Sequence, residues 1–185
     1  MVLPGTLWTI GHSTRSAEEF LALLAGNGIG SLADVRRFPG SRKYPHFNVE
    51  PLAHALREAG IEYAPFPELG GRRKPVPDSP NTAWRNDAFR GYADYMQTPE
   101  FTAGIERLAA LASASRTAIM CSEAVWWRCH RGLVSDVFKL NGTRVLHIMG
   151  PGEPREHPYT SAAHVADGRL DYAADQHELP IRGEP

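Results

Sequence analysis

The sequence is poor in several features that would each indicate a particular class of protein. It has two cysteines in 185 residues, which argues against a disulfide framework and for thiols that stay reduced. It has no apolar run of the roughly 20 residues that a membrane helix needs. Its first residues lack the charged and apolar segments of a secretory signal. These absences predict a cytoplasmic protein that does not enter a membrane.

An excess of charge of either sign is also missing. The formal net charge is -1 and the pI is near 6.7, which argues against a wholesale nucleic-acid binder, although a local basic patch does not show in that sum. Hydrophobic residues make up 42% and charged residues 22%, the ordinary balance of a globular protein. A chain of this length can form a hydrophobic core without a disulfide or a structural metal. We therefore expect no metal and no cofactor.

Short β-leaning runs alternate with helical patterns along the chain. Strands are expected near residues 7–10, 31–36, 61–66, 117–120 and 143–149. This alternation predicts an α/β fold of three layers, in which a mainly parallel sheet of about five strands is flanked by helices. Residues 1–149 would form this single domain. Residues 150–185, rich in proline, glycine and charge, would form a C-terminal tail that is partly ordered.

The helices have recognisable starting points in the sequence. Ser16 and Glu19 have the spacing of a capping box, and Asn48 and Thr98 are typical capping residues. Further helices are expected near residues 87–96 and over residues 132–140. The loop from Pro67 to about Trp84 is longer than compact domains usually keep without a function such as that of a lid.

The stretch from Cys121 to Arg131 holds both cysteines and joins a buried strand to a helix. Ligands sit at such crossings in parallel sheets, because strand carboxyl ends and helix amino ends converge there. Cys129 has the better case for a reactive thiol, because Arg128, His130 and Arg131 flank it. A buried and inert Cys129 is an equal alternative, and core packing is the favoured interpretation of Cys121.

Other candidate groups follow strands whose carboxyl ends should share one edge of the sheet. The predicted catalytic residues are Cys129, His130, Glu123, Asp34 and His12, and the predicted substrate-binding residues are Arg36, Arg128, Arg131, Ser13 and Cys121. A structural ion pair is the alternative for Asp34 with Arg36, and a helix-start charge for Glu123. A metal site is disfavoured, because adjacent Cys129 and His130 would diverge by about 100° on a helix.

Cations and aromatic rings also gather in the predicted loops of the same layer. They are Arg36, Arg37, Arg42, Lys43, Arg72, Arg73 and Lys74, with Tyr44, Phe47, Trp126 and Trp127. Cations that pair with phosphate, next to rings that stack, suit a nucleotide or single-stranded nucleic acid. A solvated basic face with packed tryptophans is an equal alternative.

An ordered set of short motifs resembles the domain of unknown function 488 family over about residues 8–148. The motifs are Thr9-Ile10-Gly11-His12-Ser13, Asp34-Val35-Arg36, Leu69-Gly70-Gly71, Phe89-Arg90-Gly91-Tyr92-Ala93-Asp94-Tyr95-Met96, Cys121-Ser122-Glu123 and Cys129-His130-Arg131. The resemblance implies a compact prokaryotic α/β domain in which these positions are characteristic. It implies no reaction.

Together these features favour an enzyme that acts on a phosphate-bearing or other anionic substrate, with nucleotides and nucleic acid among the candidates. The alternative is a non-catalytic module that binds the same class of ligand with the same residues. The expected partner is thus a small-molecule anion, a nucleotide or a nucleic acid.

Overall fold

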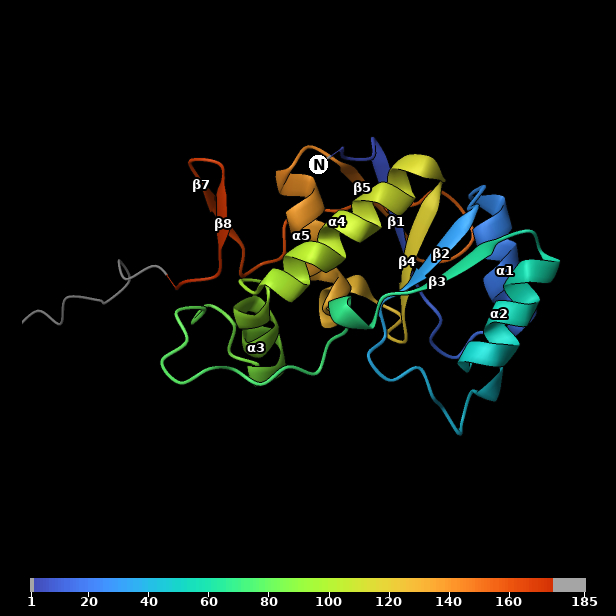
Figure 1. The fold of residues 1–185 in the computed structure, drawn as a ribbon, viewed down its shortest axis with the longest axis horizontal. Helices are drawn as coiled ribbons and strands as arrows, with labels where there is room; N and C mark the ends of the chain where they lie inside the picture. Colours follow the sequence, from blue (N-terminus) through green and yellow to red (C-terminus); the bar gives the residue numbers. More distant parts are fainter. Residues whose placement is uncertain (1, 175–185) are drawn as a thin grey trace, which may run out of the picture.

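The computed structural model describes residues 2–174, which fold around a central sheet (Figure 1). This sheet has six strands. Its strands are β1 (Thr6–Gly11), β2 (Ser31–Asp34), β3 (Glu62–Pro65), β4 (Thr117–Cys121), β5 (Arg144–Ile148) and β6 (Arg155–Glu156). Their order is β3-β2-β4-β1-β5-β6, and all neighbouring pairs are parallel except β5 with β6. The predicted α/β fold with a mainly parallel sheet is confirmed.

Helices cover both faces of the sheet. On one face lie α1 (Ala17–Gly26) and α2 (Val49–Glu58), and on the other lie α4 (Pro99–Ala114) and α5 (Arg131–Leu140) (Figure 1). Below α4 and α5, α3 (Asp87–Tyr95) adds side chains to the same core. Side chains of β4 alternate between the two cores: Ala118 and Met120 pack with α1 and α2, whereas Ile119 and Cys121 pack with α4 and α5. No helix within residues 2–174 is long and apolar enough to cross a membrane.

Two of the three predicted helix caps are present. Ser16 and Glu19 form the capping box of α1, with both hydrogen bonds at 3.0–3.1 Å. Thr98 caps α4 by accepting from the Phe101 amide. The cap predicted at Asn48 is wrong in one respect, because its side chain makes no bond to α2. Instead Asn48 Oδ1 accepts from the Ser41 amide at 2.7 Å and ties down the preceding loop.

The segment after Gly150, where we predicted a tail, packs against the domain over its described part. Beyond β6, the hairpin of β7 (His164–Ala166) and β8 (Arg169–Asp171) lies beside α5. Three polar side chains of this segment are buried, namely His157, Thr160 and Tyr172. Residues 175–185, the rest of the predicted tail, lie outside the described residues.

Candidate functional site

A cavity of about 650 Å³ opens where the carboxyl ends of β1, β2 and β4 meet. Eight of the ten predicted site residues line it, namely His12, Ser13, Arg36, Cys121, Glu123, Arg128, Cys129 and His130. The other two, Asp34 and Arg131, are buried behind the cavity wall. The parallel topology therefore brings the chemical groups of three separate segments to one place.

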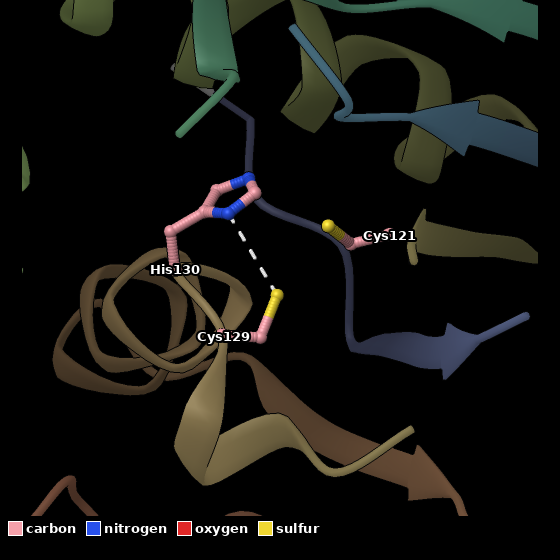
Figure 2. A group of neighbouring side chains, drawn as sticks. All are labelled: Cys121, Cys129 and His130. Atoms are coloured by element: carbon pink, nitrogen blue, oxygen red, sulfur yellow. Dashed lines mark hydrogen bonds between the residues drawn. The ribbon is translucent and has the colours of Figure 1, made fainter. Parts of the chain in front are cut away.

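Cys129 and His130 point toward the same space, which corrects our expectation that they diverge. Cys129 has an extended backbone, with φ -138° and ψ 143°, and α5 begins only at Arg131. The helical angle of 100° per residue therefore does not apply between them. Cys129 Sγ lies 3.7 Å from His130 Nδ1, and Cys121 Sγ approaches both from the end of β4 (Figure 2).

The two thiols differ in acidity. Burial opposes ionisation of Cys129, but the Cys121 thiol and the guanidinium and backbone amide of Arg131 favour the thiolate more strongly, and its pKa falls to about 6. The neighbouring Cys129 thiolate, together with burial, raises the pKa of Cys121 to about 12. The close pair of thiols thus carries one negative charge, which resides on Cys129.

The imidazole of His130 is held in one orientation. Its Nε2 lies 3.0 Å from the backbone oxygen of Val35, which can only accept, so Nε2 carries a hydrogen. The remaining nitrogen, Nδ1, faces Cys129. Gly71 packs over the ring so closely that a Cβ there would lie 2.8 Å from Nδ1. His130 Nδ1 is therefore in place to take a proton from the Cys129 thiol.

Arg131 acts on Cys129 from behind and does not face the cavity. Only 1% of its surface is exposed, so our prediction that it contacts substrate directly is not supported by its position. Its guanidinium donates to the Glu123 carbonyl at 2.6 Å, to Thr9 Oγ1 at 3.4 Å and to Cys129 Sγ at 3.4 Å. A fixed positive charge thus lies against the thiolate.

Asp34 holds Arg36 and does not reach the cavity, so the geometry matches the structural ion pair that was its alternative role. Its carboxylate accepts from the Arg36 guanidinium at 2.7 and 2.8 Å and from the Tyr63 hydroxyl at 2.7 Å. Both oxygens are occupied and 2% of the residue is exposed. Burial lowers the pKa of Arg36, but the Asp34 carboxylate outweighs that effect and the net change is a rise. Arg36 therefore presents a permanent positive charge to the cavity.

His12 is a neutral group that faces Arg36 Nη1, whereas Asp34 binds Arg36 Nε and Nη2. Its ring stacks on Phe47 with 4.2 Å between centroids, Nδ1 lies 3.0 Å from the Ser13 carbonyl, and Nε2 lies 3.4 Å from Arg36. Burial is the main cause that lowers the pKa of His12, to about 4, and the Arg36 charge adds to it. At neutral pH its Nε2 is therefore an acceptor.

Positive charge dominates the cavity wall. Four arginines line it, Arg36, Arg37, Arg72 and Arg128, against the single carboxylate of Glu123. Two lining residues other than glycine, Ser13 and Arg72, have left-handed backbones with φ of 50° and 59°. Such conformations cost free energy and persist where the surrounding structure imposes them. The excess of arginines over carboxylates suits the wall to an anion.

Cys121, Cys129 and His130 form the one group of three or more His, Cys, Asp and Glu side chains within residues 2–174 whose donor atoms all lie within 4.8 Å of one another. Three such donors with an open position resemble a catalytic zinc site. However, the Arg131 guanidinium already donates to Cys129 Sγ at 3.4 Å, and that fixed charge would repel a divalent cation. The arginine already neutralises the thiolate, and the absence of a metal stays our prediction.

Several cavity residues were not among the predicted site residues, and most of them belong to loops without periodicity. They are Thr14, Phe38, Gly40, Ser41, Gly71 and Asn86, with Ala88 and Phe89 in the first turn of α3. Arg37, Tyr44 and Arg72 also line the cavity and belong to the predicted basic and aromatic set. The available signals were the cationic, aromatic loop after Arg36 and the long loop after Gly70. Of the predicted basic and aromatic set, Phe47 is buried, and the Arg73 guanidinium lies 3.5 Å above the Tyr95 ring.

Asp94, a motif residue for which sequence gave no role, fastens the long loop. It accepts from the Val76 amide at 2.9 Å and from Asn81 Nδ2 at 2.7 Å. Burial raises the pKa of Asp94, but these two hydrogen bonds and the one from Ser79 lower it by more, so the net change is downward. On the same helix, a Cβ at Gly91 would lie 2.4 Å from the Lys74 backbone carbon. This motif holds the loop that carries Arg72 in place.

Comparison with known proteins places the chain in a family. No curated protein and no solved structure matches it. A family model with the description "Domain of unknown function DUF488" matches residues 16–138, about two thirds of the chain and the greater part of the cavity. With its fold and this match, the chain belongs to the DUF488 family of proteins.

Proposed function

We propose that the protein is an enzyme whose Cys129 thiolate attacks an anionic substrate held by the arginines of the cavity. The observation that carries this proposal is the Cys129 Sγ, 3.7 Å from His130 Nδ1 and 3.4 Å from Arg131 Nε, in a cavity lined by four arginines. An acidic thiol beside a base is the arrangement of covalent catalysis. Phosphate-bearing compounds are the proposed substrate class.

The proposed reaction transfers a group from the substrate to water in two steps. His130 Nδ1 takes the proton of Cys129, and the thiolate sulfur forms a bond to the electrophilic atom of the substrate. The bond to the leaving group breaks, and that group takes the electron pair and the proton from His130. Water then attacks the thio-linked group, gives a proton to His130 and releases the Cys129 thiolate.

The other residues of the cavity bind and orient in this proposal. Arg36 and Arg128 pair with the negative oxygens of the substrate, whereas Arg131 stabilises the thiolate from behind. Glu123 is the one lining carboxylate and is placed to exchange a proton with the leaving group or with water. Asp34 acts only through Arg36, because its oxygens are already occupied.

Protection from alkylation tests whether an anion binds over Cys129. We expect inorganic phosphate to slow the reaction of Cys129 with iodoacetamide in the wild type, as followed by mass spectrometry of the intact protein. Arg128→Gln should lose this protection, whereas Arg57→Gln, which removes an exposed arginine of α2 outside the cavity, should keep it. Equal alkylation with and without phosphate in the wild type would contradict the proposal.

Turnover is tested with a chromogenic phosphate ester and a set of nucleotides. We expect hydrolysis by the wild type and none by Cys129→Ser, because a serine hydroxyl is not ionised in this setting. An activity that Cys129→Ser retains would assign the chemistry to other groups.

A non-catalytic module for single-stranded nucleic acid is the second candidate, and exposed aromatic rings favour it. Phe38 lines the cavity with 63% of its surface exposed, and Trp127, next to the lining Arg128, is 51% exposed. The guanidinium groups of Arg37 and Arg72 lie 5.4 and 6.0 Å from the Phe38 ring. Steeply salt-dependent binding of an oligonucleotide without turnover, weakened by Phe38→Ala, would favour this candidate.

A further inference from the structure

A continuous chain of buried hydrogen bonds leads from Asp136 to the arginine behind Cys129. Asp136 Oδ1 lies 2.9 Å from His157 Nε2, and His157 Nδ1 lies 2.9 Å from His147 Nε2. His147 Nδ1 lies 2.7 Å from Thr9 Oγ1, which accepts from Arg131 at 3.4 Å. Each of these five residues is at most 1% exposed. None of them lines the cavity, and the proposed reaction uses only Arg131 directly.

The Asp136 end of the chain is an ionised carboxylate. Besides His157, it accepts from the Thr160 amide at 2.9 Å, the Thr160 hydroxyl at 2.6 Å and the Tyr172 hydroxyl at 2.9 Å. Four donors converge on its two oxygens, which suits a carboxylate that only accepts. Burial and Asp136 together raise the pKa of Tyr172, so its hydroxyl keeps its proton.

The two charged ends assign every proton between them. Because Asp136 only accepts, His157 Nε2 carries a hydrogen and His157 Nδ1 is free to accept. His147 Nε2 then donates to it, and His147 Nδ1 accepts from the Thr9 hydroxyl. The oxygen of Thr9 accepts in turn from Arg131. All donors therefore point toward Asp136, and both imidazoles are neutral with the hydrogen on Nε2.

If the donors of this chain pointed toward Arg131 instead, one proton would have no acceptor. If His157 were an imidazolium, its Nδ1 would donate to His147, and His147 would donate to Thr9. Within residues 2–174 the Thr9 hydroxyl has two hydrogen-bonding neighbours, His147 and Arg131, and both would then be donors. The hydroxyl hydrogen would be buried without a partner, which costs about 1–3 kcal/mol.

The ring of His147 is also fixed from the side. Trp126 stacks on it with 4.6 Å between centroids and 6° between planes. Burial lowers the pKa of His147 to about 2, with His157 and Arg131 as further causes, so this imidazole stays neutral. The hydrogen-bond chain therefore cannot reorient at its central member, His147.

We propose that Asp136, His157, His147 and Thr9 are positioning residues, which hold the Arg131 guanidinium against Cys129 through a one-way chain of hydrogen bonds. This proposal rests on the proposed function of Cys129. The negative carboxylate polarises the chain toward Arg131, so the guanidinium stays charged and oriented although it is buried. The segment after β5 supplies His157 together with Thr160 and Tyr172, and so completes a site whose cavity it does not line.

Histidine tautomers give the most direct test, because the measurement needs no substitution. We expect ¹⁵N spectra of the histidine-labelled wild type at neutral pH to show His147 and His157 neutral with the hydrogen on Nε2. A hydrogen on Nδ1 of His147, or an imidazolium at His157, would overturn the one-way chain. Assignment uses the loss of each signal in His147→Gln and His157→Gln.

The link to Cys129 is tested with a substitution of nearly equal shape. Thr9→Val removes the hydroxyl between His147 and Arg131, and we expect alkylation of Cys129 below pH 6 to slow about threefold, equivalent to a rise of about half a pKa unit. Asp136→Asn should slow it about tenfold. The control is Thr143→Val, which removes another buried hydroxyl, bonded to the Pro4 carbonyl far from the cavity. It should leave the rate unchanged.

The results separate this proposal from the proposed function. Unchanged alkylation in Thr9→Val, with folded protein by circular dichroism, would overturn the positioning role and leave Cys129 as nucleophile. If wild-type Cys129 is unreactive, the proposed function fails. The tautomers then still decide whether the chain exists. If Asp136→Asn does not fold, Thr9→Val and the wild-type spectra carry the test.

Discussion

Cys129 is the residue whose acidity decides the proposed chemistry. Because its pKa is lowered to about 6, the thiolate predominates above that pH and is lost as the pH falls below it. We expect the alkylation rate of native protein to rise with a midpoint near pH 6. Cys121, whose pKa is raised to about 12, should react only after unfolding.

The control for that profile is Cys129→Ser, which should remove the reaction with a midpoint near pH 6. If both thiols stay unreactive below pH 9 in the native protein, the nucleophile role fails. His130 and Glu123 would then be the acid-base pair to test.

Gly11 shows why one position of the first motif has no side chain. A Cβ there would lie 1.8 Å from the Glu123 carbonyl oxygen and 3.0 Å from Arg131. We expect Gly11→Ala to lower the free energy of unfolding by at least about 3 kcal/mol in urea titrations, because backbone atoms must move apart. Gly5→Ala, at a site with no atom within 4 Å, is the matched control and should change little. A stable Gly11→Ala protein would show that this contact is not tight.

The placement of most candidate residues followed from the sequence, whereas their exact contacts did not. His12, Arg36 and Glu123 follow strands, and parallel strands end at one edge, so their shared location was predictable. The pairing of Cys129 with His130 was missed, because it depends on an extended backbone just before α5. A helical pattern in the sequence does not reveal where its first turn begins.

At the scale of elements, the loop between η2 (Pro67–Leu69) and α3 depends on one carboxylate. We expect Asp94→Asn to destabilise the protein by about 1 kcal/mol and to speed proteolysis near Arg72, because its bonds to the loop weaken. The control is Asp87→Asn on the same helix, where the carboxylate is largely exposed. Equal proteolysis of both variants would contradict this role.

The pH dependence of Asp94 has a definite sign. Its pKa in the folded protein is lowered, so its contribution to stability is present above the unfolded pKa of about 3.9 and is lost as the pH falls. The stability of Asp94→Asn should therefore approach that of the wild type in acid. Unfolding free energies measured across acidic pH values check this expectation.

Helices and strands whose apolar residues recur with a clear period were predicted well, whereas the shortest strands were missed. The face of α4 recurs at Phe101, Ile105 and Leu108, all of which are buried. By contrast β6, β7 and β8 have two or three residues each, too few to show an alternation. β6 pairs with β5, and β7 and β8 pair with each other. The residues next to these strands contact Asp136, which is distant in sequence.

For the whole molecule, the segment after Gly150 is expected to be essential. A chain that ends at Met149 lacks His157, Thr160 and Tyr172 and leaves the buried Asp136 carboxylate without these donors. Leaving a buried charge unpaired costs about 3–5 kcal/mol, a large part of the stability of a domain. We expect this truncation to be unfolded by circular dichroism.

A chain that ends at Ala174 is the control for this truncation, because it retains every contact described above. It should remain folded by circular dichroism. A folded protein that ends at Met149 would show that Asp136 finds other partners.

The hydrogen-bond chain behind Cys129 has a consequence for how such proteins diverge. Because all its donors point one way, changing a single polar member leaves its neighbours with unmatched protons. A relative that has lost the histidine at position 157 should therefore also have replaced the aspartate at 136 and the histidine at 147. These positions are expected to be inherited or lost as a set, even though His147 and His157 lie outside residues 16–138, which the family model matches.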